Sequence, residues 1–249
     1  MGSRLALALR LNLFSPLRMD APPFFRVRNL SELARSPFPT GVNALCWERT
    51  LPGDYAEIVR LIGHGNGEPI TPLDEALLLG LPLSDAGRVA AQQMLDDLQQ
   101  LRDLGLDPAL NCIHGYPRDD SDAPVATDVF SYHADSAPIE ADTWLCTYFG
   151  ACSEALRSED AVRRVEVPAT RAALLQGYGG PDDARFEEFL REQCYDLHYV
   201  PKAGANPYSF GVGNLWRIAT EFPGSPVPPC VHRAPSTRPG DPARLLLIS

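Results

Sequence analysis

Proline and glycine interrupt this chain so often that long regular elements are confined to a few stretches. There are 24 prolines and 19 glycines among 249 residues. Proline fixes φ and lacks a backbone donor, and glycine favours turns, so both tend to end helices and strands. The stretches with helical periodicity are residues 54–62, 84–104, 170–176 and 181–193. The sequence therefore favours short elements joined by many turns.

Strand patterns dominate the chain after residue 109. The candidate strands are residues 110–114, 129–135, 143–149, 196–200, 208–212, 215–220 and 244–248. Strands that follow a helical part predict an α+β fold, and we expect a double-stranded β-helix, which is a jelly-roll or cupin-like barrel. Residues 41–249 would form this single β-barrel domain, after an N-terminal tail and lead-in at 1–40. Helices within 54–104 would brace the barrel, and 170–193 would be a helical insertion.

The charge of the chain limits its partners. Its formal net charge is −10, so the chain repels phosphate backbones and nucleic acid is not an expected partner. No apolar run approaches the roughly 18 residues that a membrane span needs, so no membrane partner is expected either. We expect a small-molecule partner, and the sequence indicates no oligomeric state.

Cysteine usage indicates a reducing compartment. None of the cysteines forms a CxxC pair, and their scatter through apolar segments is typical of reduced core thiols rather than of a zinc site or a disulfide framework. They are Cys46, Cys112, Cys146, Cys152, Cys194 and Cys230. Arg10 interrupts the apolar run near the N-terminus, so residues 1–19 do not resemble a signal peptide. We expect a cytoplasmic protein with a frayed tail, or with extra residues ahead of a true start at Met19.

The segment Tyr132-His133-Ala134-Asp135-Ser136 carries the first chemical motif. Side chains alternate between the two faces of a strand, so His133 and Asp135 are expected to point the same way. An imidazole and a carboxylate then converge on one point without any unusual backbone. This HxD motif predicts two ligands of a metal ion.

A third ligand is expected from His232, which lies 97 residues after Asp135 and ahead of a final strand. Two histidines and one carboxylate can occupy one face of a metal and leave the other positions open. Non-haem Fe(II) oxygenases use this arrangement because co-substrate and O₂ need open positions. The group of His133, Asp135 and His232 therefore predicts a single mononuclear Fe(II) centre, although the same ligands also accept zinc.

Arg244 lies twelve residues after His232, at the start of Arg244-Leu245-Leu246-Leu247-Ile248. A guanidinium is always charged and can hold a carboxylate through two parallel N–H donors. An arginine that opens a strand shortly after the distal histidine can therefore grip the far carboxylate of 2-oxoglutarate. We assign Arg244 as the binding residue for this co-substrate.

Several segments of the chain resemble the uncharacterised DUF1826 family. They are Gly41-Val42-Asn43-Ala44-Leu45-Cys46-Trp47-Glu48-Arg49, His133-Ala134-Asp135, Leu145-Cys146-Thr147-Tyr148, and His232-Arg233-Ala234-Pro235 through Arg244-Leu245-Leu246-Leu247. The resemblance covers about residues 40–249, with a divergent middle, and implies a grouping of motifs rather than a reaction. The order of the motifs is similar to that of the 2-oxoglutarate oxygenase superfamily. That similarity implies His133, Asp135 and His232 as metal ligands and Arg244 as the co-substrate anchor.

Three further residues are candidates for binding the substrate. Arg217 on a strand could meet an acidic substrate, and Tyr132 and Trp144 could line the site, although aromatic residues on strands are more often part of the core. His198 shares a strand face with Asp196 and is an alternative ligand in a three-histidine site. A core histidine bonded to Asp196 is the plainer interpretation of that residue.

The sequence thus predicts an Fe(II)/2-oxoglutarate-dependent dioxygenase that oxidises a C–H bond of a small polar substrate. A non-redox protein that handles or senses zinc is one alternative. An iron enzyme like the thiol dioxygenases, without 2-oxoglutarate, is a second. A binding barrel whose HxD motif is incidental is a third.

Overall fold

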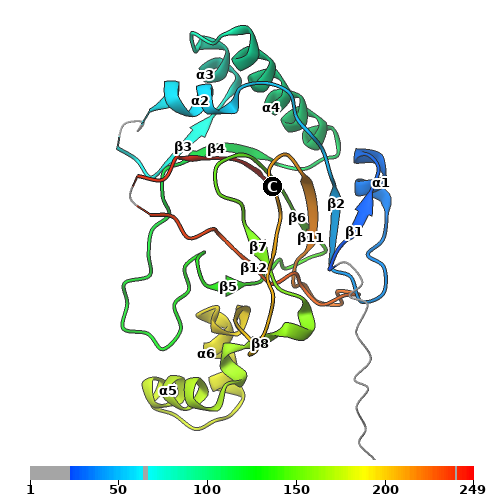
Figure 1. Cartoon of the computed structure of the whole chain (residues 1–249). Helices are drawn as coiled ribbons and strands as arrows, with labels where there is room; N and C mark the ends of the chain where they lie inside the picture. The colour runs from blue at the N-terminus through cyan, green and yellow to red at the C-terminus, as the bar shows by residue number, and fades with distance from the viewer. Residues whose placement is uncertain (1–22, 64–66, 239) are drawn as a thin grey trace, which may run out of the picture.

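The structure is a computed structural model that describes residues 23–63, 67–238 and 240–249. The expectations for residues 1–19 lie outside the described residues. The fold is α+β, as predicted, and contains two sheets with helices at two ends of the molecule (Figure 1). No described helix has both the length and the apolar character needed to cross a membrane.

The larger sheet has seven strands in the order β1-β2-β11-β6-β13-β4-β3. Only the β1–β2 pair is parallel, and the other neighbours are antiparallel. The long strand β6 lies near the middle of the sheet and is buried along most of its length. The strands are β1 (Phe25–Val27), β2 (Ala44–Trp47), β3 (Ile70–Leu73), β4 (Ala109–Ile113), β6 (Asp142–Phe149), β11 (Leu215–Ala219) and β13 (Arg244–Ile248).

The smaller sheet has six short strands in the order β10-β7-β12-β5-β9-β8, all antiparallel. Single bridges from Ser136 to Glu221 and from Thr147 to Val212 link the rims of the two sheets. In the described ranges the sheets do not close into one continuous barrel. The strands are β5 (Tyr132–His133), β7 (Glu154–Ala155), β8 (Ala161–Arg163), β9 (His198–Pro201), β10 (Tyr208–Ser209) and β12 (His232–Arg233).

Helices pack on the outer face of the larger sheet. Asp54 caps α2 (Tyr55–Ile62) and Ser84 caps α4 (Asp85–Asp103), and both side chains accept hydrogen bonds from orphan backbone donors. The shorter α1 (Leu30–Arg35) and α3 (Glu75–Gly80) complete this layer. Figure 1 shows α2, α3 and α4 together over β3 and β4.

The predicted insertion forms a separate helical pair at the opposite end of the molecule (Figure 1). It consists of α5 (Pro168–Tyr178) and α6 (Ala184–Glu192). These helices bury Phe186 and Leu190 in a small cluster of their own, together with Val125. The short 3-10 segments are η1 (Ser158–Asp160), η2 (Arg164–Glu166) and η3 (Tyr195–Leu197), and η3 leads into β9.

The alternation of side chains divides the core into two layers. On β13, Leu245 and Leu247 face the helices, whereas Leu246 faces the smaller sheet. On β11, Trp216 and Ile218 likewise belong to the layer between the sheets. Odd and even residues of one strand therefore enter different cores, and a functional residue on these strands belongs to one face only.

Several elements differ from the sequence prediction. The strand expected at 129–135 is only Tyr132–His133, so Asp135 lies beyond its end. Residues 195–197 form the 3-10 turn rather than the beginning of a strand. The lead-in at 1–40 contains β1 and α1, because β1 pairs with β2 and Asn29 caps α1. Strand pairing between distant segments, which a local pattern does not contain, accounts for these differences.

Candidate metal centre

Two predicted ligands lie side by side in the smaller sheet. His133 on β5 and His232 on β12 are direct cross-strand partners in antiparallel register. Their ring centroids are 4.6 Å apart, and both side chains are largely buried. Residues directly opposite each other on neighbouring strands point to the same face. Strand pairing alone therefore brings together two histidines that are far apart in the sequence.

Asp135 completes the group from just beyond the end of β5. Its carboxylate oxygens lie 3.9 Å from His133 Nε2 and 3.7 Å from His232 Nε2. The hydroxyl of Thr143 on β6 donates to Asp135 Oδ2 at 2.5 Å, and the backbone N–H of Glu221 donates to the Asp135 carbonyl at 2.7 Å. The larger sheet thus fixes the orientation of the Asp135 carboxylate, although Asp135 itself comes directly after β5 of the smaller sheet.

Backbone carbonyl groups fix the tautomer of both histidines. His133 Nδ1 lies 2.8 Å from the Ser131 carbonyl oxygen, and His232 Nδ1 lies 3.1 Å from the Cys230 carbonyl oxygen. A carbonyl oxygen only accepts hydrogen bonds, so each Nδ1 carries the proton. The lone pair then lies on Nε2, and both Nε2 atoms face Asp135. Metal-binding histidines commonly have this support behind the ring.

The electrostatics of the group favour the protonation states that a metal needs. Burial lowers the pKa of His133, and repulsion from His232 lowers it further. Burial alone would raise the pKa of Asp135, but attraction to His232 and the hydrogen bond from Thr143 outweigh it, and this pKa lies below its usual value. A neutral imidazole beside an ionised carboxylate is the state that ligates a cation.

The group fits a metal ion in its donor chemistry and its dimensions. One ligand atom from each of the three residues can be chosen so that all lie within 4.8 Å of one another. A metal with bonds of about 2.1 Å at right angles holds its ligands about 3 Å apart. The distances of 3.7 and 3.9 Å need only a small contraction to reach that value. His133, Asp135 and His232 are therefore a possible metal-binding triad.

Arg244 at the start of β13 is a buried cation without a buried anion. Its side chain shares a strand face with Leu246 and is directed toward the layer between the sheets. Nη2 donates to Thr147 Oγ1 at 2.8 Å and to Ser153 Oγ at 2.9 Å, and Nη1 lies 3.4 Å from the Tyr116 hydroxyl. No described Asp or Glu lies within ion-pair distance of it. Burial lowers the pKa of Arg244, which marks a cation that has lost solvent without gaining a counter-charge.

A short path of contacts joins Arg244 to the triad. Ser153, which accepts from Arg244, lies two residues before Ala155 on β7. Ala155 is the direct partner of His232 in the smaller sheet. The guanidinium and the distal histidine are thus held on opposite sides of the same layer.

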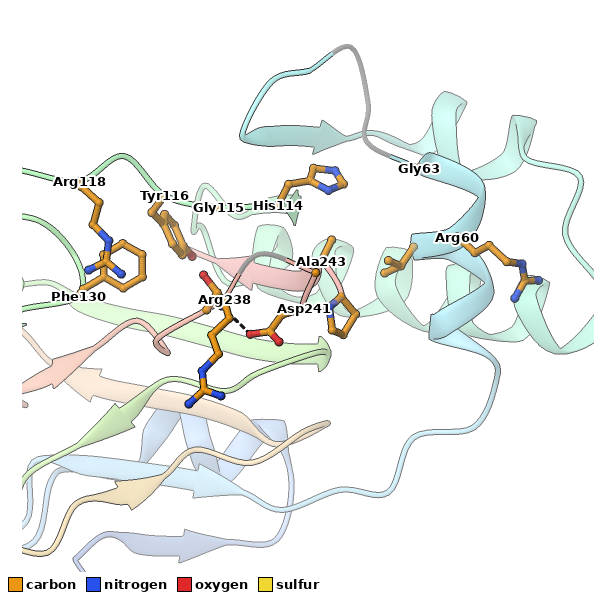
Figure 2. Close-up of a pocket in the computed structure, with 14 residues that line it drawn as sticks. Arg60, Gly63, His114, Gly115, Tyr116, Arg118, Phe130, Arg238, Asp241 and Ala243 are labelled. Carbon is orange, nitrogen blue, oxygen red and sulfur yellow. Dashed lines mark hydrogen bonds between the residues drawn. The ribbon is translucent and has the colours of Figure 1, made fainter.

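A cavity of about 700 Å³ adjoins Arg244 through Tyr116 (Figure 2). Figure 2 shows Arg118 and Phe130 beside Tyr116, and His114 and Gly63 further along the lining. Ala243, the residue before Arg244, also lines the cavity. His133, Asp135 and His232 are not among the described residues that line this cavity.

The structure does not bring the three residues that were expected to bind the substrate to the triad. Arg217 lies between Trp216 and Ile218 on β11 and therefore points to the opposite face, where it bonds Asp142 and the carbonyl groups at the end of α1. Trp144 belongs to the core on the helix side. Tyr132 points away from His133 and donates to Glu154 at 2.6 Å. Side chains alternate between the two faces of a strand, and the sequence does not show which face meets the triad. This alternation accounts for all three placements.

His198 is a neighbour of the triad and not a member of it. It pairs directly with His133 across β9 and β5, and their ring centroids are 5.9 Å apart. Burial lowers its pKa to about 4, with repulsion from His133 as the next cause. Its Nδ1 is buried and has no hydrogen-bond partner among the described residues, so the expected bond to Asp196 is not formed.

The supporting residues around the site were missed in the sequence. Thr143 on β6 holds Asp135, and Arg244 contacts Thr147 on β6, Ser153 before β7 and Tyr116 after β4. A threonine every fourth residue on an otherwise apolar strand was the available signal, because buried hydroxyl groups need partners.

Comparisons with family models, curated proteins and solved structures give no match to this chain. The resemblance to the DUF1826 family therefore remains a prediction.

Proposed function

We propose that this protein is a mononuclear non-haem Fe(II) oxygenase that uses 2-oxoglutarate. The observation that carries the proposal is the buried, unpaired guanidinium of Arg244, which faces the same layer between the sheets as the triad. A metal with three protein ligands keeps open positions for a chelating co-substrate. A desolvated cation close to such a metal fits the far carboxylate of that co-substrate.

The strand order supports a jelly roll as the fold of this proposal. When β8 and β9 are set aside as additions, eight strands remain from β4 to β13. Numbered in chain order, they form one sheet in the order 6-3-8-1 and another in the order 5-4-7-2. In this order the first strand is a neighbour of the eighth and the second strand is a neighbour of the seventh. This is the strand order of two Greek keys in a jelly roll. His133 and His232 then lie on the second and seventh strands, Asp135 follows the second strand, and Arg244 opens the eighth.

The residues of the chain have separate roles in this proposal. Iron and 2-oxoglutarate would supply the oxidising chemistry once both are bound with O₂. His133, Asp135 and His232 would hold the metal on one face, and Thr143 would orient the carboxylate. Arg244 would fix the far end of the co-substrate, with Thr147 and Ser153 keeping the guanidinium in place. The apolar layer around Leu246 and Trp216 would exclude water.

The substrate would be a small molecule, and the protein would work in the cytoplasm. Support for a reducing compartment comes from the cysteines, all six of which are free. The alternative of a zinc protein uses the same three ligands but gives Arg244 no task.

Anaerobic titration of the protein with Fe(II), with and without 2-oxoglutarate, tests the proposal. A weak visible charge-transfer band that needs both components is the expected result, because the band arises when 2-oxoglutarate chelates Fe(II). Metal binding without such a band would leave a metal protein and reject the oxygenase. Absence of Fe(II) binding would reject the metal centre as well.

A further inference from the structure

The cavity beside Tyr116 carries more positive charge than the rest of this acidic protein would lead one to expect. Arg118 and Arg238 line it, and neither has a described Asp or Glu within ion-pair distance. Asp241 also lines the cavity and accepts a hydrogen bond from the Arg238 backbone N–H. Arg60 also lines the cavity, but it does not add to this positive charge, because it pairs with Glu57 and reaches away from the other residues in Figure 2.

One of these guanidinium groups is already held in position. Arg118 lies over the ring of Phe130 at 3.5 Å from the ring centroid, a cation–π contact that restricts the side chain. Stacking uses the face of the guanidinium and leaves its in-plane N–H donors available. A planar fork of this kind suits a carboxylate or a phosphate group. In a chain with a formal net charge of −10, such a cavity is a local attractor for anions.

The same aromatic wall connects the cavity to the candidate metal centre. Tyr116 and Phe130 meet edge to face at 5.9 Å, and the Tyr116 hydroxyl contacts Arg244. Phe130 immediately precedes Ser131, whose carbonyl oxygen holds His133. A ligand that presses on this wall is therefore adjacent to both Arg244 and the segment that positions a metal ligand.

We propose that this cavity binds a small organic anion. Its carboxylate or phosphate group would bind Arg118 and Arg238, and an apolar or aromatic part would lie against Tyr116 and Phe130. The volume of about 700 Å³ is within the range of small-molecule sites and exceeds what a simple inorganic ion needs. This inference goes beyond the proposed function and does not depend on it.

The test uses metal-free full-length protein and two probes, phenyl phosphate and benzoate. Calorimetry measures their affinity, and arginine-selective modification with phenylglyoxal, mapped by peptide mass spectrometry, locates them. We expect at least one probe to bind and to slow the modification of Arg118 and Arg238. Binding of phenyl phosphate alone would assign a phosphate group, and binding of benzoate alone would assign a carboxylate.

Matched variants decide whether the cavity holds the probe. Arg118→Gln is expected to weaken it about tenfold or more, since a hydrogen-bonded charge pair is lost. Arg185→Gln, at an exposed position on α6, is expected to change nothing. Circular dichroism verifies that each variant is folded. If neither probe binds, or if Arg244→Met abolishes binding while Arg118→Gln does not, the inference is overturned. Probe binding in a protein that shows no Fe(II)–2-oxoglutarate band would retain the anion cavity and reject only the oxygenase.

Discussion

At the scale of single residues, the hydrogen bonds behind the metal ligands decide what the site can bind. Carbonyl groups two residues earlier in the chain accept hydrogen bonds from the Nδ1–H groups of His133 and His232. Thr143 holds one oxygen of Asp135. Both rings and the carboxylate are thus oriented before any ion arrives, which lowers the reorganisation needed for binding.

Replacing Arg244 should affect the co-substrate and spare the metal. Losing a hydrogen bond to a charged group costs about 1.5–3 kcal/mol, so Arg244→Met should weaken 2-oxoglutarate by roughly tenfold to a hundredfold. Arg244→Lys should restore little, because an ammonium lacks the planar fork. Fe(II) affinity should hardly change. Competition titrations measure both constants, with Arg185→Met as the control. Unchanged 2-oxoglutarate affinity in Arg244→Met would assign the co-substrate to another base.

Thr143→Val should weaken the metal site without removing a ligand. It deletes the hydroxyl that donates to Asp135 and keeps the shape of the side chain, and losing such support typically costs tenfold or more in metal affinity. Thr220→Val is the control for the loss of a buried hydroxyl, because the Thr220 hydroxyl donates to the Ala141 carbonyl oxygen. Metal competition with a chelator measures the difference. Equal affinities in the two variants would show that Thr143 does not support Asp135.

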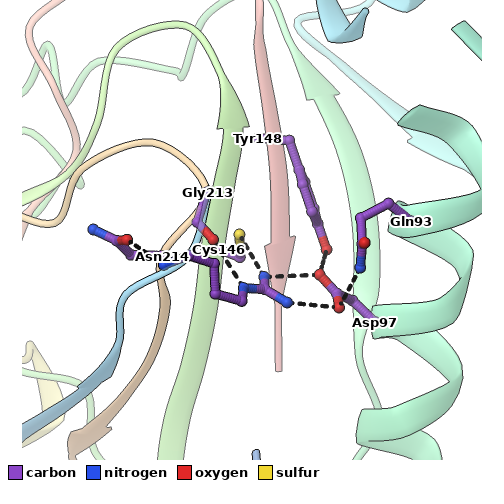
Figure 3. A network of polar contacts seen from close by, with 7 residues as sticks. Gln93, Asp97, Cys146, Tyr148, Gly213 and Asn214 are labelled. Atoms are coloured by element: carbon purple, nitrogen blue, oxygen red, sulfur yellow. Dashed lines mark hydrogen bonds and ion pairs between the residues drawn. The ribbon is translucent and has the colours of Figure 1, made fainter. Parts of the chain in front are cut away.

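At the scale of elements, a buried polar network joins α4 to the larger sheet (Figure 3). Asp97 on α4 accepts from Arg49 Nη1 and Nη2, both at 2.8 Å, and from the Tyr148 hydroxyl at 2.8 Å. The two charged side chains are only 6% and 3% exposed. Arg49 also donates to the Gly213 carbonyl oxygen, so the network reaches the loop before β11. Helix and sheet are thereby fixed in one relative position.

Asp97→Ala should therefore be strongly destabilising. It leaves the Arg49 guanidinium buried without its anion, and breaking a buried pair in this way costs about 3–5 kcal/mol. Asp96→Ala, one residue away on the exposed side of the same helix, should cost less than about 1 kcal/mol. Chemical denaturation of the two variants measures this contrast. Similar free energies of unfolding for both would mean that the network adds little stability.

Local sequence patterns predict the longer elements and not the shortest ones. Helices α2 and α4 have apolar stripes and capping residues, so their limits follow from the residues themselves. Strands β7, β10 and β12 have two residues each and exist only through pairing with distant partners. The shared direction of His133 and Asp135 was predictable from their spacing. The direction of Arg217 was not, because a lone strand does not reveal which of its faces meets the metal.

At the scale of the whole molecule, the chain places its candidate chemistry between two sheets and its helices outside them. Arg244 and Thr143 extend from the larger sheet, and both histidines extend from the smaller one. Neither sheet contains a complete site. A shift of one sheet relative to the other would therefore separate both histidines from Arg244, and Asp135 from the hydroxyl that orients it.

The cysteines report on the integrity of this arrangement. Burial raises the pKa of Cys112 to about 11 and that of Cys146 and Cys230 to about 12, whereas Cys194 is exposed. A thiol reagent should modify Cys194 promptly in the folded protein and reach the buried thiols only after unfolding. Under denaturing, non-reducing conditions all six should be free. Fewer than five free thiols would indicate a disulfide and contradict a reducing compartment.

The central claim is that His133, Asp135 and His232 bind one metal ion. Its most direct test is elemental analysis after anaerobic loading with Fe(II), for the wild type and for the three single alanine variants. We predict about one iron per wild-type chain, and loss of most of it in every variant while circular dichroism remains that of a folded protein. Retention only in His232→Ala would give the third ligand position to His198. Full occupancy in all three variants, or no iron in the wild type, would contradict the metal centre.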